Sequence, residues 1–330
     1  VLGFSRGLFS QVAYEVARGS LIKITFQGEK FEAGSKSWIP VKNSKGIETK
    51  KYLAVLNKEF PTDTLECELV TNLPPGKYNL YLSARVLGTI RPPVLVTDNL
   101  NVMPPIITNL SSKLSAGGMV IIASGTYFGS IPPKILISYT NSETGKTIKR
   151  ICSVLRPLEY DDARGCGGKS CMNVETGESK VAFFIPEKLP VADYKLILFC
   201  VSGTTESVLS MTGPNIGTVY PAIASAGDEV AVEGLYFGQK KPRMWFEYIH
   251  PKTLKIATMP ITIVTPLEYP DAYDHGGQSC MELETGKSLV RFIVPPGLPN
   301  GECNIFLDNG TGSAFVLFTC RFHISGKISR

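Results

Sequence analysis

A loop that occurs twice in the sequence carries the side chains best suited to metal chemistry. Carboxylate, imidazole and thiolate groups can all ligate zinc. They stand at matching positions of the two copies, which are Asp162, Cys166 and Cys171 in the first and Asp271, His275 and Cys280 in the second. Asp162, Asp271 and His275 are weak metal candidates, because neither ligand set is complete and calcium would also suit the carboxylates. The alternative is a structural loop closed by a Cys166–Cys171 disulfide, and we expect no cofactor.

The sequence contains no recognisable catalytic motif. It has three histidines and lacks the patterns of nucleophile elbows, zinc proteases and dinucleotide-binding loops. The run Gly167-Gly168-Lys169-Ser170 is similar to the end of a phosphate-binding loop, but Ala163 replaces the earlier glycine of that motif. We therefore predict that the chain is not an enzyme.

The chain has eight cysteines, and none has the CxxC spacing of a metal or redox motif. Two pairings follow from their spacing, which are Cys303–Cys320 across a terminal hairpin and Cys152–Cys200 within the second repeat. Cys67 and Cys280 have no obvious local partner, so they are either buried thiols or bonds between subunits. This cysteine usage points to an oxidising compartment.

Exposed aromatic side chains could form a platform for a polysaccharide. Trp38 follows a Gly- and Ser-containing segment and Tyr273 lies in the repeated loop, so both are glycan candidates. Trp245 stands in an alternating strand, where we expect its ring to face the core. Asn109 and Asn309 begin triplets with the N-glycosylation pattern, which arises often by chance.

The first nine residues are unusually apolar for a chain terminus. Val1, Leu2, Phe4, Leu8 and Phe9 are the assembly candidates of this segment. An exposed sheet edge accepts an added strand, so the segment could pair with a neighbouring subunit and build a head-to-tail polymer. The alternative is that it packs on its own domain.

These groups are placed by a long internal repeat. Gly125-Thr126-Tyr127-Phe128-Gly129 recurs 109 residues later as Gly234-Leu235-Tyr236-Phe237-Gly238, and Ser170-Cys171-Met172 recurs with the same offset as Ser279-Cys280-Met281. A fainter copy precedes both. A period of this length indicates tandem domains, since solenoid repeats are much shorter. A feature found in both copies is expected to be structural, whereas a feature of one copy is the better functional candidate.

Strand patterns fill every copy of the repeat. Short alternating or apolar runs are bounded by turns rich in Gly, Pro and Asn, at a spacing typical of β-sandwiches. The boundaries we predict are 1–103, 104–212 and 213–330, and the first domain carries the apolar extension. Prolines 104, 105 and 214 restrict both linkers. The expected fold is all-β, with three tandem sandwich domains in an elongated, semi-rigid rod.

The opening of each later copy resembles the IPT/TIG domain, an immunoglobulin-like fold. The resemblance rests on a proline-led strand, a small-residue turn (115–118, then 225–228) and the Gly-x-Tyr-Phe-Gly corner. It implies that the corner glycines are turn positions and that the aromatic residue packs in the core. Tandem IPT/TIG proteins of the bacterial cell-surface type are the group that the chain is most similar to.

Charge and hydropathy exclude several classes of function. The net charge of +5 comes from scattered lysines and no run of 18 apolar residues exists, so we expect neither nucleic-acid binding nor a membrane span. We expect a secreted or cell-surface location, with the signal peptide already removed. The predicted function is a structural, self-assembling homo-oligomer or polymer subunit of a surface filament or layer. The alternative is an adhesive protein that captures glycans through exposed aromatics.

Overall fold

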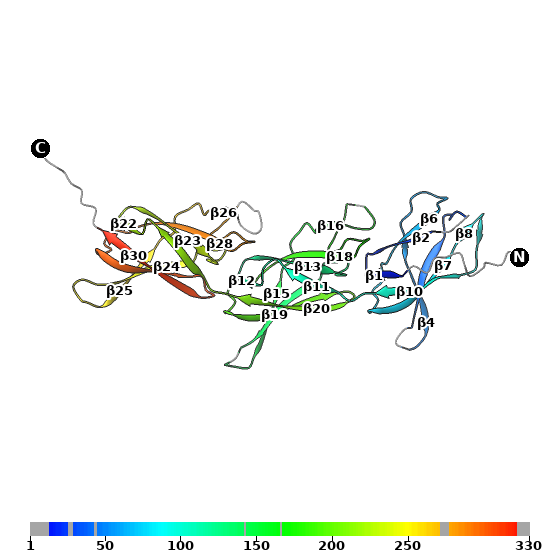
Figure 1. Ribbon diagram of the computed structural model, residues 1–330, viewed down its shortest axis with the longest axis horizontal. Helices are drawn as coiled ribbons and strands as arrows, with labels where there is room; N and C mark the ends of the chain where they lie inside the picture. Colours follow the sequence, from blue (N-terminus) through cyan, green and yellow to red (C-terminus); the bar gives the residue numbers. More distant parts are fainter. Residues whose placement is uncertain are drawn as a thin grey trace.

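The computed structural model describes residues 13–25, 29–42, 45–141, 143–165, 167–270 and 277–321. Regular structure in these ranges consists of β-strands, which form three β-sandwich domains in a row (Figure 1). The first domain lies at one end of an elongated rod and the third at the other. The prediction of an all-β rod of three tandem immunoglobulin-like domains is confirmed. In the described ranges, no helix is long and apolar enough to cross a membrane.

The first domain packs a five-stranded sheet of order β1-β10-β7-β3-β4 against a three-stranded sheet of order β2-β6-β5. The short pair β8-β9 stands apart from both. The strands are β1 Tyr14–Val16, β2 Leu21–Thr25, β3 Lys36–Lys42, β4 Glu48–Tyr52, β5 Ala54–Val55, β6 Thr64–Glu68, β7 Gly76–Ser83, β8 Arg85–Val86, β9 Thr89–Ile90 and β10 Val94–Val102.

The second domain has sheets of order β12-β20-β19-β14-β15 and β11-β13-β18, and its inserted loop forms the pair β16-β17. The strands are β11 Ile106–Leu110, β12 Leu114–Ser115, β13 Val120–Thr126, β14 Lys134–Thr140, β15 Thr147–Cys152, β16 Tyr160–Asp161, β17 Lys169–Ser170, β18 Glu178–Phe184, β19 Ala192–Cys200 and β20 Gly203–Met211.

The third domain repeats this topology, with sheets β22-β30-β29-β24-β25 and β21-β23-β28 and the loop pair β26-β27. The strands are β21 Asn215–Tyr220, β22 Ile223–Ser225, β23 Glu229–Leu235, β24 Arg243–Ile249, β25 Ile256–Ile261, β26 Tyr269–Pro270, β27 Gln278–Ser279, β28 Lys287–Ile293, β29 Gly301–Asp308 and β30 Ser313–Arg321.

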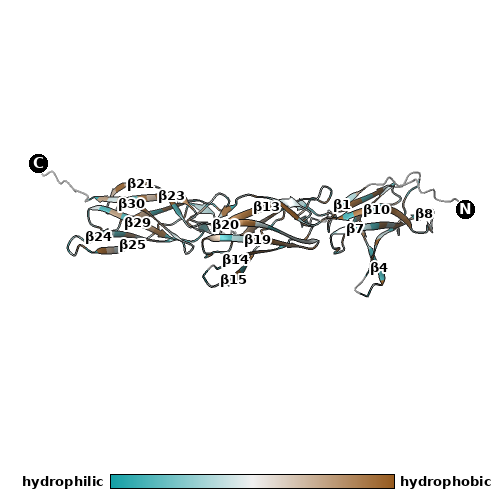
Figure 2. Ribbon diagram, turned by 60° about the horizontal axis from the view of Figure 1, so that its bottom comes forward, coloured by the Kyte–Doolittle hydropathy of each residue, from teal (hydrophilic) through white to brown (hydrophobic). Residues whose placement is uncertain are grey.

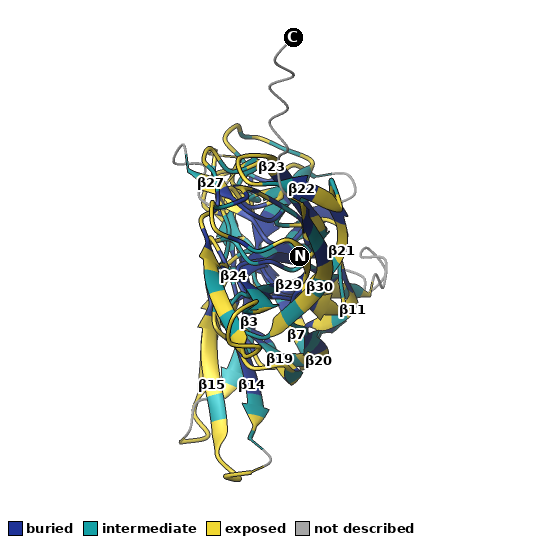
Figure 3. Ribbon diagram, turned by 90° about the vertical axis from the view of Figure 1, so that its left-hand side faces the viewer, coloured by how far each residue is buried: buried dark blue, intermediate teal, exposed yellow. Residues whose placement is uncertain are grey.

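Alternation of side chains along the strands builds a separate core in each domain. In β24, Met244 and Phe246 are buried between the sheets, whereas Arg243 faces solvent. Hydrophobic residues gather along the strands of all three domains (Figure 2). Seen along the rod, the buried residues fill the space between the sheets, and the β14–β15 hairpin projects from it (Figure 3).

The repeated corner supplies one large core side chain to each of the last two domains. Phe128 and Phe237 are fully buried, as the resemblance implied. The first corner glycine is required for space and not for an unusual φ. A Cβ at Gly125 would overlap the carbonyl of Ile106 on β11, and a Cβ at Gly234 would overlap the carbonyl of Asn215 on β21. The second corner glycine, Gly129, has a φ of +86°, as expected of a turn glycine.

The predicted disulfides are wrong. The seven described cysteines are free thiols, and six of them are buried. Cys303 lies opposite Phe318 and Cys320 lies opposite Gly301, so the expected partners are two residues out of register on neighbouring strands. Cys152, Cys171 and Cys200 are free as well, and Cys166 lies outside the described residues.

Burial, not cross-linking, explains the position of these thiols. It raises the pKa of Cys152, Cys171, Cys200 and Cys303 to about 12, so they remain protonated at neutral pH. A buried protonated thiol packs like a small apolar side chain. The cysteine count therefore no longer supports an oxidising compartment.

Candidate functional site

The repeated tyrosine and methionine lie between domains and not in domain cores. Tyr127 and Met172 of the second domain form a cluster with Ala17 of the first, and Met103 of the linker packs against it. The third domain repeats this arrangement, in which Met281 packs against Ala116 and Met119 of the second domain, with Tyr236 beside them. We call these two contacts the first joint and the second joint.

Neighbouring residues of the Ser-Cys-Met motif point in opposite directions, which is why one motif serves two cores. Cys280 packs into the core of its own domain, and Met281 packs into the second joint. The Ser279 hydroxyl donates to the Met281 carbonyl at 2.8 Å and accepts from the Met281 N–H at 3.0 Å. These two bonds hold the bend that turns the methionine outward.

The corner holds each tyrosine in a strained backbone conformation. Tyr127 and Tyr236 have φ values of +61° and +65°, which are uncommon for residues with a side chain. Gly177 and Gly286 lie directly beneath the two rings, and a Cβ at either glycine would overlap the ring. Strain of this kind persists only where surrounding contacts enforce it. The surrounding contacts therefore hold these two tyrosine side chains at the joints.

Backbone hydrogen bonds cross both joints at equivalent positions. The Leu21 N–H of the first domain donates to the Val174 carbonyl of the second at 2.8 Å. One repeat later, the Val120 N–H donates to the Leu283 carbonyl at 2.9 Å. A backbone hydrogen bond forms only when the two bonded segments are correctly aligned. Each of these bonds therefore constrains the relative orientation of the two domains that it joins.

Polar side chains add to the first joint. The Tyr127 hydroxyl donates to the Glu15 carboxylate at 2.8 Å. Burial, with a smaller effect of this bond, raises the pKa of Tyr127 to about 12. The phenol therefore stays protonated and can act as the donor at any physiological pH.

Ion pairs span both joints. At the exposed rims, Lys23 and Glu175 lie 3.0 Å apart in the first joint, and Lys240 and Glu187 lie 2.9 Å apart in the second. The first joint has a further pair, Arg164 with the mostly buried Glu68, at 2.9 Å. The hydrogen bond from Lys23 to Glu175 raises the pKa of Lys23. Exposed pairs of this type contribute little to stability, so the apolar clusters and backbone bonds carry most of each joint.

Each joint is received by a glycine turn at the distal end of the preceding domain. A Cβ added at Gly19 would overlap the side chain of Ser130, and a Cβ added at Gly118 would lie 3.0 Å from the side chain of Gln239. Gly227 occupies the same turn of the third domain, with a φ of +93° against +86° for Gly118. The structure thus pairs Gly118 with Gly227, one residue away from the alignment expected from the sequence.

The receiving turn of the third domain has a different surface. Asp228 and Glu229 occupy the positions of Met119 and Val120, and both are exposed. Within the part of the chain that the structure describes, no heavy atom lies within 4 Å of an added Cβ at Gly227. This turn therefore lacks the apolar surface with which Met119 meets the next domain.

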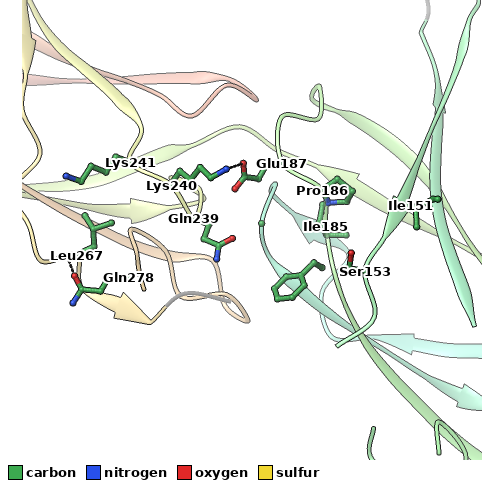
Figure 4. Close-up of a pocket in the computed structure, with 12 residues that line it drawn as sticks. Ile151, Ser153, Ile185, Pro186, Glu187, Gln239, Lys240, Lys241, Leu267 and Gln278 are labelled. Atoms are coloured by element: carbon green, nitrogen blue, oxygen red, sulfur yellow. Dashed lines mark hydrogen bonds and ion pairs between the residues drawn. The ribbon is translucent and has the colours of Figure 1, made fainter. Parts of the chain in front are cut away.

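A groove of about 650 Å³ opens beside the second joint (Figure 4). The second domain supplies an apolar wall that includes Ile151 and Ile185. The third domain supplies Gln239, Lys241 and Gln278. The backbone N–H of residue 267 donates to Gln278 Oε1 at 2.7 Å, which orients that amide.

The polar wall of this groove occurs in one copy only. The equivalent segment of the first joint reads Ser130-Ile131-Pro132, where the second joint has Gln239-Lys240-Lys241. Grooves of this size between domains are common ligand sites. By the rule that a feature of one copy is the better functional candidate, this groove is a better candidate for a binding site than the surface of the first joint.

The glycan candidates of the sequence are not brought together. Trp38 is only 7% exposed, so the prediction that it is exposed is wrong. Its ring stacks on Tyr81 with centroids 4.7 Å apart, and the Lys50 ammonium lies 4.3 Å from the ring centre on strand β4. Tyr273 lies outside the described residues.

Of the remaining site candidates of the sequence, some lie in the described ranges and the others lie outside them. In the described ranges, no three His, Cys, Asp or Glu side chains lie together as metal ligands. Asp162 shares a turn with Gly165 and Gly168. Asp271, His275 and the assembly candidates Val1, Leu2, Phe4, Leu8 and Phe9 lie outside the described residues. The Asn309 amide donates to the Tyr236 carbonyl at 2.7 Å, so it supports the corner next to the second joint.

Sequence reasoning missed an aromatic row on the outer face of the third domain. Trp245 was expected in the core, but it is half-buried on the outside, beside Phe306 and Phe315. The signal was present in the alternation of β24, because Arg243 and Glu247 are on the same side of the strand as Trp245.

No protein-family model matches the chain, and the search of curated proteins finds no match. Among solved structures, the SGBP-B protein of the mixed-linkage glucan utilization locus of Bacteroides ovatus, in complex with a mixed-linkage heptasaccharide, is 13% identical with a TM-score of 0.26. The alignment covers 96% of this chain and 68% of that chain. A fragment of the titin I-band is 13% identical with a TM-score of 0.21, over 96% and 97% of the two chains.

A tetra-tandem repeat from the extending region of a large adhesion protein is 10% identical with a TM-score of 0.21, over 92% of this chain and 71% of that one. These likenesses concern tandem immunoglobulin-like architecture alone. At such identities and TM-scores they carry no argument about function.

Proposed function

We propose that the chain is an extracellular structural protein whose three domains form a stiff spacer with contact surfaces along it. The observation that carries this proposal is the repeated joint. Met172 and Met281 are fully buried at equivalent domain boundaries, and a backbone hydrogen bond accompanies each. Domains that only share a linker are expected to move relative to one another. The same joint fixes the relative orientation of neighbouring domains at both boundaries. This suits a protein that holds the two ends of a rod at a fixed distance.

The proposal includes membership of the IPT/TIG group of cell-surface type and assigns no catalytic activity to the chain. It is supported by the Gly-x-Tyr-Phe-Gly corner, whose phenylalanine packs in the domain core. The corner tyrosine adds a role that the resemblance did not imply, since it belongs to the joint. Self-assembly through residues 1–9 stays a prediction, and deletion of that segment should abolish any polymers that it builds.

Electron microscopy of the purified chain tests the spacer function. We expect straight rods of uniform length and a narrow distribution of angles between domains. Replacing both joint methionines, Met172→Ala and Met281→Ala, should broaden that distribution. Wild-type particles that bend at the joints as widely as the double variant would overturn the proposal.

The groove at the second joint supports a second candidate function, which is capture of a glycan. Side-chain amides both donate and accept hydrogen bonds, as sugar hydroxyls do, and Gln239 and Gln278 line the groove together with the apolar Ile151 and Ile185. A glycan array probed with the wild-type chain would identify binding. Gln278→Ala should then reduce it, whereas Lys169→Ala, at the equivalent position of the first joint, should not. Equal loss in both variants, or no binding, would reject the groove as the site.

A further inference from the structure

The outer edge of the third domain has a strand, β30, that is paired on only one side over most of its length. β30 pairs with β29 along its length, but on its other side β22 accompanies only residues 319–321. The Thr319 N–H donates to the Ala222 carbonyl at 3.1 Å. Because backbone groups alternate in direction along a strand, Leu317, Phe315 and Ser313 turn their N–H and C=O groups to the same side. No described strand is hydrogen-bonded to these groups, although β21 of the other sheet passes close to β30.

The equivalent edges of the other two domains carry features that discourage strand pairing. On β20, Glu206 stands at the position of Phe315 and forms an ion pair with Lys195 at 2.9 Å. β10 has two register irregularities and an aspartate, Asp98. Charges and bulges are the usual protection of a sheet edge. The free part of β30, which reads Ser-Ala-Phe-Val-Leu-Phe, has neither.

A stack of aromatic rings runs across the outer face of the sheet toward this edge. The Trp245 and Phe306 rings lie 5.2 Å apart at an angle of 5°, and Phe306 and Phe315 lie 5.3 Å apart at 28°. The Arg243 guanidinium lies over the Trp245 ring, 5.3 Å from its centroid. The stack therefore ends at Phe315, which is 65% exposed, with Leu317 beside it at 57%.

We propose that this edge pairs with the same edge of a second copy of the chain. In an antiparallel arrangement about a twofold axis, Phe315 faces the partner's Phe315, and Ser313 faces the partner's Leu317. All of these residues turn their backbone groups outward, so their N–H and C=O groups can complete a ladder. The two five-stranded sheets become one continuous sheet, and the aromatic stack continues from one copy into the other.

A second copy suits this edge better than a glycan or an unrelated partner. The faces of Trp245 and Phe306 are already covered by neighbouring groups, so only the outer face of Phe315 is open to stacking. That face lies beside unpaired backbone groups, which a strand satisfies. An isologous contact requires a self-complementary surface, and an uncharged strand brings no like charges together.

Sedimentation equilibrium of the full chain tests this proposal, which goes beyond the spacer function. We expect a reversible monomer–dimer equilibrium in the wild type. The variant Phe315→Glu with Asn304→Lys places the β20 ion pair on β30, and the same fold already tolerates that pair in the second domain. It should remain monomeric. Leu317→Lys should also weaken the dimer at least tenfold, while Val208→Lys, at the equivalent position of β20 and 59% exposed, should not.

Hydrogen exchange provides a readout that locates the contact. The amides of residues 313–318 should exchange more slowly as the protein concentration rises, and the equivalent amides of β20 should not change. A wild type that stays monomeric up to about 1 mM, or an undiminished dimer in the ion-pair variant, would overturn the proposal. Circular dichroism of each variant confirms that a loss of dimer is not a loss of fold.

Discussion

Replacing Met281 with alanine should loosen the second joint while leaving both adjoining domains folded. The Met281 side chain is fully buried among Ala116, Met119 and Tyr236. Truncation of a fully buried methionine costs about 2–5 kcal/mol. Because the lost contacts lie between domains, this cost reduces the stability of the closed joint more than that of either sandwich.

The size of the effect can be stated as a population. A loss of about 3 kcal/mol changes an equilibrium roughly 100-fold. If the joint is open in about 0.1% of wild-type molecules, it should be open in about a tenth of the Met281→Ala molecules. Small-angle scattering should then show a shorter mean end-to-end distance and a broader distance distribution.

Met244→Ala is the matched control, because Met244 is 3% exposed but belongs to the core of the third domain. It should lower the melting temperature of that domain without changing the scattering of the folded chain. A double-mutant cycle of Met281→Ala with Met119→Ala should give a coupling of about 0.5–3 kcal/mol, as for side chains in contact. If Met281→Ala behaves like Met244→Ala and the cycle shows no coupling, the assignment of Met281 to the joint is refuted.

Three further predictions concern other contacts. Gly286→Ala combines a φ of +77° with overlap of the Tyr236 ring, so scattering should show a loosened second joint at a cost of about 1–3 kcal/mol; an unchanged scattering profile would contradict this. Tyr127→Phe removes the bond to Glu15 and should weaken the first joint by about 1 kcal/mol. Since the folded-state pKa of Tyr127 is raised to about 12, its contribution should be full below pH 10 and be lost as the pH rises through 12, which scattering across that range would check. The buried cysteines should resist iodoacetamide at pH 8 in the native chain and react fully in urea without reductant; missing thiols in urea would restore the disulfide hypothesis.

The fold was predictable because it depends on local and periodic properties. Alternating apolar residues predict strands, turn residues predict their ends, and an offset of 109 residues predicts domains in tandem. The joint was not predictable by the same logic. In a tandem array, neighbouring domains meet through the same surfaces at each boundary. A residue such as Met281 therefore recurs in the sequence whether it packs in the core of its own domain or against the next domain. The divergent first copy was the available hint, because Lys30 stands where the other corners have tyrosine.

Exposure and pairing of single side chains were the least predictable properties. Trp38 and Trp245 occupy strands with similar patterns of residues. Lys50 and Tyr81 cover the ring of Trp38, whereas the ring of Trp245 stacks on Phe306 at the outer face of its sheet. Whether a ring is covered depends on the residues of the neighbouring strands, which are far away in sequence. For the same reason, the spacing of Cys303 and Cys320 gave a hairpin but not the register within it.

The sequence by itself determined that this chain is all-β and that it has three domains in tandem. Alternation and turn chemistry are written in each segment, so they need no knowledge of distant residues. Only the tertiary structure decided that Tyr127, Met172, Tyr236 and Met281 join the domains. It also decided that the seven described cysteines are unpaired and that no described strand pairs with the outer side of residues 313–318 on β30. These properties depend on which segments meet in space, and periodicity along the chain does not contain that information.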